Sequence, residues 1–430
     1  MKRIKYLCGV SAVLAFTACI DNSDETVGND KHIWHVTLQA SLGDAATLRA
    51  LNASGNKIIA SFAQNDEVVV VNADGSKIVG ILKAQTAGAS TTLSGTLDAK
   101  TLTEGEMVTL RYLSATANYD GQMGTLDSIA AKQDYAEGTL KVSSTSPLTF
   151  ESNSVTLKSK QSITKFTFKS GESNVKVKTF GIAATGLVQS ISAKGIETVG
   201  AVTGTLTTPS SDVYVALRNK GTGSQTYSFT IQDEGGNWYM FEKNATLING
   251  KNYAVTITLP TKLPTLTNSS SVGDKGVIDG LPAIVLQDST AVALMNAGSL
   301  CPEHYGKYYT YKNRASGLDN DWYVPTQAEL TALSAKPNTC NTQNGVNGCL
   351  FTIGGEKLFL PAAGYCDNDT SYDSYVGMLN VSTGGHYWST TDSDSGKAIS
   401  LSFFSAAPAV VSDYIVNKLS VRPFHALPIL

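Results

Sequence analysis

Short stretches in which apolar and polar residues alternate, separated by Gly-, Asn- and Asp-rich turns, follow one another through most of the chain. Residues 67–71 and 77–82 flank an Asn-Ala-Asp-Gly turn and predict a β-hairpin, because Gly supplies the positive φ that tight hairpin turns need. Residues 163–168 set two Phe on one side and Lys and Thr on the other, which predicts a strand with one buried face. No helical pattern longer than two turns is seen in the sequence between residues 31 and 260. The pattern therefore predicts antiparallel β-sandwiches.

Shifts in this pattern divide the chain into segments. Residues 31–143 and 144–260 each contain their own predicted strands, and we expect each to form one sandwich. The stretch 261–274 is rich in Pro, Ser and Thr and is expected to be a linker. The last segment, 275–430, combines strand patterns with a helix signal. The fold class that we predict is therefore mainly β, with two antiparallel β-sandwich domains followed by an α+β domain.

The helix signal lies directly behind Pro325. Thr326 and Glu329 have the spacing of a capping box, in which each side chain accepts a hydrogen bond from the backbone of the other. Leu330 and Leu333 then supply the buried stripe of a short helix. Strands are expected around it at 357–360, 398–403 and 418–423.

The N-terminus has the features of an export signal. Basic residues precede an apolar run over 6–16, which is too short to cross a bilayer as a helix and which ends in small residues before Cys19. The stretch 14–19 resembles a bacterial lipobox, and this implies that residues 1–18 are a lipoprotein signal peptide and that the thiol of Cys19 is lipidated. An ordinary signal peptide with a coincidental cysteine is the alternative. Residues 19–30 are acidic and are expected to be a tether.

The charge balance argues against nucleic acid as a partner. The chain has 33 Lys and Arg against 36 Asp and Glu, a net charge of −3. Its sequence shows no basic cluster beyond the N-terminus, whereas a phosphate backbone is bound by a basic stripe. We expect contact with a membrane only through the lipid anchor.

Four cysteines follow Cys19, all in the last third of the chain. In an exported protein four cysteines favour two disulfides, for which three connectivities are open, and the spacing matches no zinc pattern. We favour a Cys340–Cys349 disulfide, which closes a short Asn- and Gly-rich loop, together with a longer Cys301–Cys366 disulfide.

The sequence contains no recognisable catalytic motif. None of the five His lies in a signature with Ser or Cys that would activate a nucleophile, so we expect no enzymatic activity, no cofactor and no resident metal. Acidic turns in the last segment leave calcium open as an alternative. The candidate ligand-binding residues lie in an acidic, Tyr-containing stretch that is expected to be a surface loop, where binding residues are common. They are Tyr372, Tyr375, Asp369 and Asp373.

Residues 61–70, 118–138 and 163–168 resemble motifs of the fimbrillin family of Bacteroidales pili. The resemblance implies a lipoprotein precursor with two β-sandwich domains. It also implies that a protease cuts between Arg49 and Ala50 and that the strand before this bond then leaves.

The first strand is expected at 32–40, just before the implied cleavage site. Removal of a core strand exposes apolar surface and unpaired backbone, which a strand from another pilus subunit can cover. The alternative is that Arg49 lies in an exposed connection and is never cut.

A second resemblance covers residues 275–430. Several short motifs there, in this order, are similar to the major paralogous domain first described in Fibrobacter, and they imply a C-type-lectin-like fold without implying one role. The motifs are 305–310, 321–326 with Glu329 and Leu330, 358–365, 385–391 and 420–423.

Together these features predict a surface-exposed pilus tip subunit of the cell outer membrane that acts as an adhesin. We expect its partners to be other fimbrillin-type pilus subunits and an unknown carbohydrate or protein ligand. A surface lipoprotein that binds glycan or protein and never polymerises is the alternative. Cleavage after Arg49 is the event that separates the two.

Overall fold

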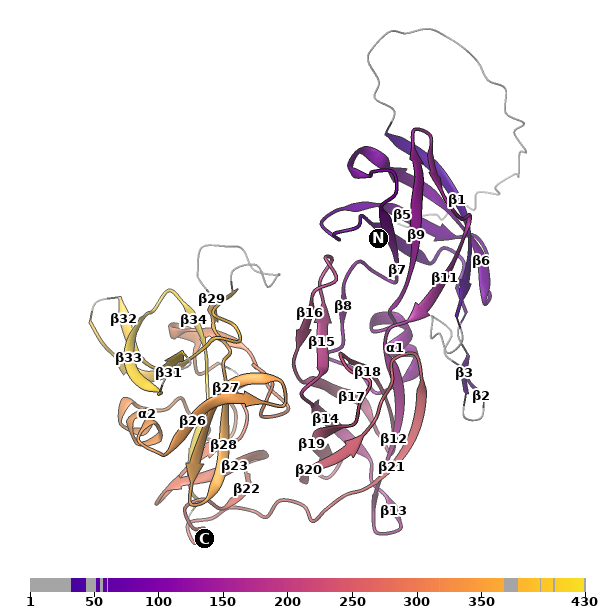
Figure 1. The fold of residues 1–430 in the computed structure, drawn as a ribbon. Helices are drawn as coiled ribbons and strands as arrows, with labels where there is room; N and C mark the ends of the chain where they lie inside the picture. The colour runs from indigo at the N-terminus through magenta and orange to yellow at the C-terminus, as the bar shows by residue number, and fades with distance from the viewer. Residues whose placement is uncertain are drawn as a thin grey trace, which may run out of the picture.

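A computed structural model of the chain is mainly β, with several antiparallel sheets, as the sequence predicts (Figure 1). Within the described residues the α-helices are α1 (Leu126–Lys132) and α2 (Gln327–Ser334). The predicted capping box is present at α2, where Thr326 and Glu329 bind each other's backbone N–H groups. The structure describes residues 32–43, 52–54, 57–59, 61–316, 318–366, 378–394, 396–404 and 407–428.

The first unit is one sheet that closes on itself, because β9 pairs with both β7 and β11. Closure leaves few unpaired strand edges. Its interior is filled by aliphatic side chains from alternate positions of the strands, among them Leu38, Leu82 and Leu110. The strands, in sheet order, are β10 (Leu148–Phe150), β9 (Ala136–Thr145), β11 (Ser154–Ser159), β1 (Ile33–Leu42), β6 (Ser90–Asp98), β5 (Ile78–Ala84), β4 (Glu67–Val71) and β7 (Met107–Tyr112). The short pair β2 (Asn52–Ser54) and β3 (Lys57–Ile59) and the 3-10 turn η1 (Ala99–Thr101) complete the unit.

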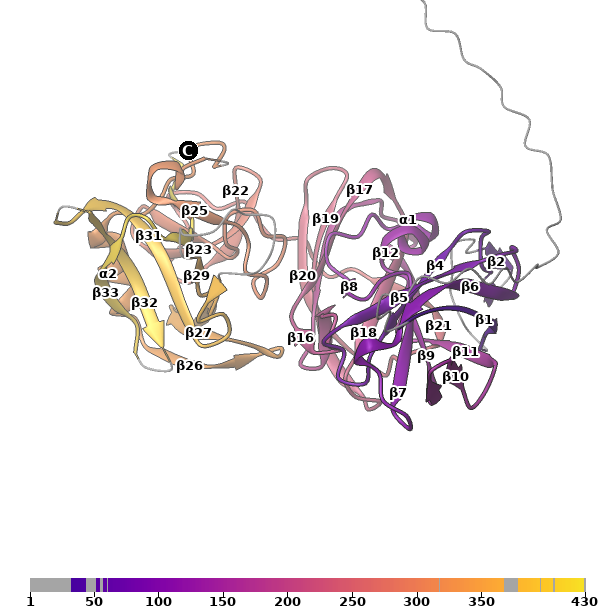
Figure 2. The ribbon, with the colours of Figure 1, turned by 90° about the horizontal axis from the view of Figure 1, so that it is seen from above.

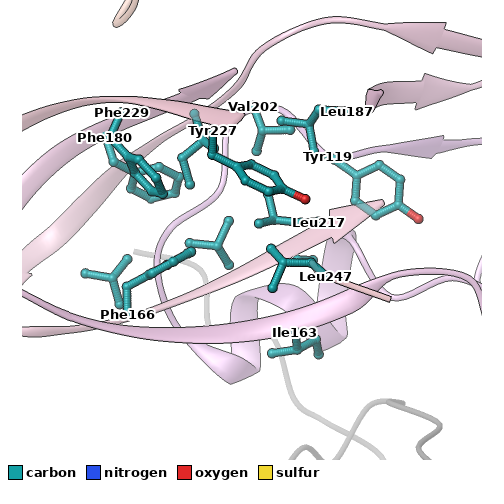
Figure 3. Close-up of a cluster of buried hydrophobic side chains, with 14 of the residues drawn as sticks. Tyr119, Ile163, Phe166, Phe180, Leu187, Val202, Leu217, Tyr227, Phe229 and Leu247 are labelled. Atoms are coloured by element: carbon teal, nitrogen blue, oxygen red, sulfur yellow. The ribbon is translucent and has the colours of Figure 1, made fainter. Parts of the chain in front are cut away.

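The second unit has two sheets around a large aromatic core (Figure 3). Phe166 of one sheet meets Phe229 of the other with their rings edge to face, and such pairs stabilise a core beyond the area they bury. One sheet contains β13 (Ser173–Asn174), β12 (Ser162–Ser170), β18 (Asp212–Asn219), β15 (Leu187–Ile191), β16 (Glu197–Val199), β21 (Asn252–Thr258) and β8 (Ala117–Asn118). The other contains β17 (Val202–Ser210), β14 (Val177–Ala183), β19 (Gln225–Asp233) and β20 (Trp238–Ala245).

The chain passes between the first and second units more than once, so the boundary expected at residues 143 and 144 is wrong. Residues 117–135 leave the first sheet after β7, and Ile129 is buried in the second core. Tyr119 lies in the same core (Figure 3). The chain then returns through β9, and both β10 and β11 belong to the first sheet although they follow residue 143. Turn signals locate strands along the chain but do not say which sheet each strand joins.

The third unit contains three small sheets and α2, which agrees with the α+β pattern of the last segment. The first sheet consists of β22 (Lys275–Ile278), β23 (Leu281–Gln287), β24 (Thr290–Ala293) and β35 (Phe424–Ala426). The second consists of β30 (Met378–Leu379), β29 (Tyr365–Cys366), β34 (Lys418–Ser420), β31 (Gly384–Asp392), β32 (Lys397–Phe404), β33 (Ala409–Tyr414) and β25 (Tyr308–Thr310), which η2 (Tyr311–Asn313) follows. The third consists of β26 (Asn338–Gln343), β27 (Val346–Ile353) and β28 (Glu356–Pro361).

The stretch 261–274, expected to be a linker, makes hydrogen bonds and buried contacts with both the second and the third unit. Leu263 donates its N–H to the carbonyl of Trp238, and Leu266 is buried in the core of the third unit. The third unit lies beside β19 and β20 of the second (Figure 2). The two units are therefore docked and not merely tethered.

Candidate assembly site and ligand-binding region

Strand β1 lies inside the closed sheet and not at its margin. It pairs antiparallel with β6 from Ile33 to Ser41 and parallel with β11 from Gln39 to Leu42. Since β1 is flanked on both sides, its removal would expose the backbone of both neighbours.

The side chains of β1 alternate strictly between the interior and the solvent. Val36, Leu38 and Ala40 are buried, and Leu38 is only 3% exposed. Between them, Thr37 and Gln39 face outward and bind side chains of β6. The face of β1 that points into the closed sheet is therefore apolar, and the face that points to solvent is polar.

The space that β1 occupies is lined by apolar residues of its neighbours. Leu93 lies opposite Leu38 in the ladder with β6, and Val155 lies opposite Ala40 in the ladder with β11. Both are buried in the same core cluster as β1. A strand with the same alternation could replace β1 in this position, because side-chain pockets and backbone ladders together determine which segment fits.

The chain that follows β1 is anchored as far as Gly43, whose N–H donates to the carbonyl of Leu157 at 2.9 Å. Arg49 and Ala50, the implied cleavage site, lie outside the described residues, and so does Cys19. In sequence Arg49 and Ala50 fall between β1 and β2, so cutting the bond between them would break the covalent link between β1 and the rest of the first unit.

The candidate ligand residues Tyr372, Tyr375, Asp369 and Asp373 also lie outside the described residues. Their segment follows β29 and precedes β30.

The structure forms one of the two expected disulfides. Cys340 and Cys349 face each other in the β26–β27 hairpin, with their Cα atoms 3.9 Å apart, and are joined by a disulfide. The expected Cys301–Cys366 disulfide is not formed. Cys301 instead packs against β14 of the second unit, where a Cβ added at Gly181 would lie 2.5 Å from the Cβ of Cys301. Burial raises the pKa of the Cys301 thiol well above its usual value.

A part-buried polar network joins the third unit to the second. Nε2 of His304 lies 2.9 Å from Oδ2 of Asp120, which precedes α1 in the chain, and the same carboxylate accepts hydrogen bonds from the backbone and hydroxyl of Thr203. Burial acts to raise the pKa of Asp120, but the contacts with His304 and the two hydrogen bonds from Thr203 together outweigh it, and the net pKa is lowered.

A second polar network at the same junction is centred on Glu303. Its carboxylate accepts from Nδ2 of Asn344 at 2.8 Å and from Nε2 of Gln343 at 3.1 Å, and Asn344 also binds Ser228 of β19. Burial raises the pKa of Glu303, and these hydrogen bonds offset only part of the increase. The sequence reasoning missed both networks, although Asp120 lies within the fimbrillin-like segment 118–138.

Other kinds of site are not seen in the described part of the chain. No group of three or more His, Cys, Asp or Glu side chains converges there in a way that could hold a metal ion. None of the described helices has the length and apolar character needed to span a membrane.

Known proteins show only weak similarity to this chain. No family model matches it, and no curated protein matches it. Among solved structures, a "putative cell adhesion protein" from Bacteroides uniformis is 14% identical with a TM-score of 0.32, over 52% of this chain and 93% of its own. A fimbrial assembly protein from Parabacteroides distasonis is 12% identical with a TM-score of 0.27, over 52% and 90%. The tip fimbrial protein Mfa3 from Porphyromonas gingivalis, with a C-terminal truncation, is 8% identical with a TM-score of 0.25, over 50% and 81%.

Proposed function

We propose that the protein is a surface-exposed pilus subunit that assembles by strand exchange in its first unit and presents its third unit as an adhesin at the tip. One observation contributes most to this proposal. Strand β1 is a central strand of a closed sheet, yet the chain continues from it directly into the segment that contains Arg49. Cleavage after Arg49 would free β1 and open a groove between β6 and β11 that a partner subunit's strand can fill.

The third unit, proposed as the adhesin, uses its last described strand within its own fold, because β35 pairs with β24 from Phe424 to Ala426.

The test compares wild-type protein with Arg49→Ala in the native host. The uncut variant should keep β1 in place and remain a folded surface monomer that fails to enter fibres, because its groove stays filled. Lys100→Ala, which removes an exposed cation from η1, is the matched control and should assemble normally. The measurements are heat-sparing gel ladders and electron microscopy of shed fibres. Equal incorporation of the uncut variant would favour the non-polymerising surface binder instead.

A synthetic peptide tests the groove directly. A peptide of residues 32–42 should block assembly of the cleaved protein, because it restores the nine residue pairs that β1 makes with β6. The same peptide with Leu38→Asp should not block, because a carboxylate cannot be placed in the apolar interior without a partner. If both peptides act equally, the groove does not select strands by side chain.

Lipid anchoring is the remaining part of the proposal. Cys19→Ser should release the protein from the membrane fraction, since stable attachment depends on the acyl chains on this one thiol. Fractionation with labelled fatty acid measures this. Retention of both label and membrane attachment in the variant would contradict the lipid anchor.

A further inference from the structure

The outer edge of the third unit is a strand with one open side. β33 ends the order of its sheet, so among the described strands only β32 pairs with it. Ile415 donates its N–H to the carbonyl of Gly396, on the β32 side. Residues of an antiparallel strand alternate between its two sides, so the N–H and C=O groups of Val410 and Ser412 point to the open side. Within the described part of the chain, no backbone group meets them there.

Apolar side chains surround this edge. Val411, Tyr414, Ile415 and Val416 are exposed, and for Tyr414 and Val416 the exposed fraction is 59% and 51%. Burial of such surface is the main favourable term in protein association. Exposed apolar side chains beside an open strand edge are typical of a surface that another chain covers.

The edge of β33 also lacks the charges that usually protect a strand edge. β20, which ends a sheet of the second unit, has the exposed charged residues Glu242 and Lys243. The charged residue of β33 is Asp413, whose Oδ2 lies 3.2 Å from Nδ1 of His386 in the same sheet. Charged side chains on an edge strand hinder its pairing with another chain. β33 is therefore open to such pairing.

The sequence of β33 is complementary to itself. Two antiparallel copies with Ser412 opposite Ser412 on a two-fold axis place Val410 of each copy opposite Tyr414 of the other. Pairs of an aromatic and a β-branched residue stabilise neighbouring strands. Asp413 lies opposite Val411 in this register, which avoids the destabilising placement of like charges directly opposite each other.

The place of β33 in the molecule leaves room for a second copy. Figures 1 and 2 both show β33 on the side of the third unit that faces away from β19 and β20. A two-fold axis at β33 therefore directs the second units of the two copies away from each other. The pairing joins two molecules end to end through their third units.

We propose that β33 pairs with β33 of a second copy, so that the third unit binds the same protein on a neighbouring fibre or cell. Its use in adhesion rests on the surface role proposed above, whereas the pairing itself does not depend on strand exchange. The residues from Ala409 to Ile415 are fewer than the roughly 20–30 residues a side of a standard interface. We therefore expect a weak dimer, with a dissociation constant of about 100 µM, which avidity between many copies strengthens.

Sedimentation equilibrium tests the pairing in solution. The full chain with Cys19→Ser, which excludes association through acyl chains, should be monomeric at about 1 µM and largely dimeric at about 500 µM. Adding Ser412→Pro to this parent removes an N–H that faces the open side, so the monomer should fold while the affinity falls about tenfold. Ser412→Ala is the matched control, because it keeps this N–H, and it should dimerise as the parent does.

Charged substitutions at the same residue test the register. Ser412→Asp and Ser412→Lys each place like charges opposite each other, so each alone should associate about fivefold more weakly. An equimolar mixture places opposite charges together and should associate at least as well as the parent. Ser412 is exposed, so neither substitution disturbs the core. Two labelled cell populations that display the two variants should form mixed aggregates and few aggregates of one label.

Several results would overturn the proposal. They are a parent chain that stays monomeric at about 500 µM, equal dimerisation of Ser412→Pro and Ser412→Ala, and a mixture that associates no better than its components. Dimers in solution without mixed cell aggregates would overturn the adhesive use. Fibre assembly, followed in parallel, separates this proposal from the proposed function. Normal fibres without dimers would leave the proposed function in place, and dimers without fibres would do the reverse.

Discussion

At the scale of single residues, Asp120 and His304 connect parts of the chain that are 184 positions apart. Their side chains are 21% and 14% exposed, so solvent screens the pair only partly. The pKa of Asp120 is lowered in the folded protein, against an ordinary value of 3.8. The carboxylate form is therefore the one that stabilises the junction between the second and third units.

A pH dependence follows from this lowered pKa. A depressed folded pKa contributes stability above the unfolded value of 3.8 and loses it as the pH falls through the folded value. Asp120→Asn should therefore lower stability by about 2 kcal/mol near neutral pH, and the difference from wild type should shrink below about pH 3.8. Thermal unfolding at about pH 5.5 and about pH 2.5 measures it. A difference that is the same at both pH values would show that the charge of Asp120 has no role.

The cysteines show what residue-level reasoning from sequence can and cannot give. Cys340 and Cys349 are close in sequence across an Asn-Gly turn, so a hairpin brings them together almost automatically. Cys301 and Cys366 are far apart in sequence, and their pairing depends on tertiary packing. Cys301 contacts Gly181 of β14 in the second unit, and nothing in the neighbouring sequence predicts this contact.

At the scale of elements, β1 is the strand on which the proposed assembly depends. Leu38→Ala in the Arg49→Ala background should cost about 3 kcal/mol, because it leaves a cavity in the closed sheet. Thr37→Ala, one residue away on the solvent face, should change stability by no more than about 0.5 kcal/mol. Chemical denaturation compares them.

The same pair of variants gives a sharper result in cleaved protein. If β1 has left, its side chains no longer contribute, and the two variants should have equal stability. A Leu38→Ala defect that persists after cleavage would mean that β1 stays bound. This comparison separates cutting of the chain from loss of the strand.

Strand and helix positions followed well from the sequence, whereas sheet membership did not. The hairpin at 67–82, the strand at 163–168 and the capping box at Thr326 all depend on neighbouring residues, and the structure contains each of them. That β1 lies between β6 and β11 depends on which strands meet in space. Alternation identifies a buried face but not the neighbour that covers it.

At the scale of the whole molecule, Gly181 allows the second and third units to dock closely. An alanine there would place its Cβ 2.5 Å from Cβ of Cys301 and 3.0 Å from the carbonyl of Leu300, so Gly181→Ala should destabilise the junction by about 1–3 kcal/mol. Gly221→Ala is the matched control, because its added Cβ would meet no atom within 4 Å. Limited proteolysis between the units and thermal unfolding measure the effect. Equal behaviour of the two variants would contradict a tight junction.

The threefold crossing of the chain between the first and second units has a mechanical consequence. The chain passes between them after β7, before β9 and after β11. Tension applied between the groove proposed at β1 and the third unit would therefore be shared by three covalent connections at this boundary. The second and third units are joined by the single connection near residue 260, supported by noncovalent contacts such as Asp120–His304. Under a pulling force we therefore expect the noncovalent contacts between the second and third units to break before the first and second units separate.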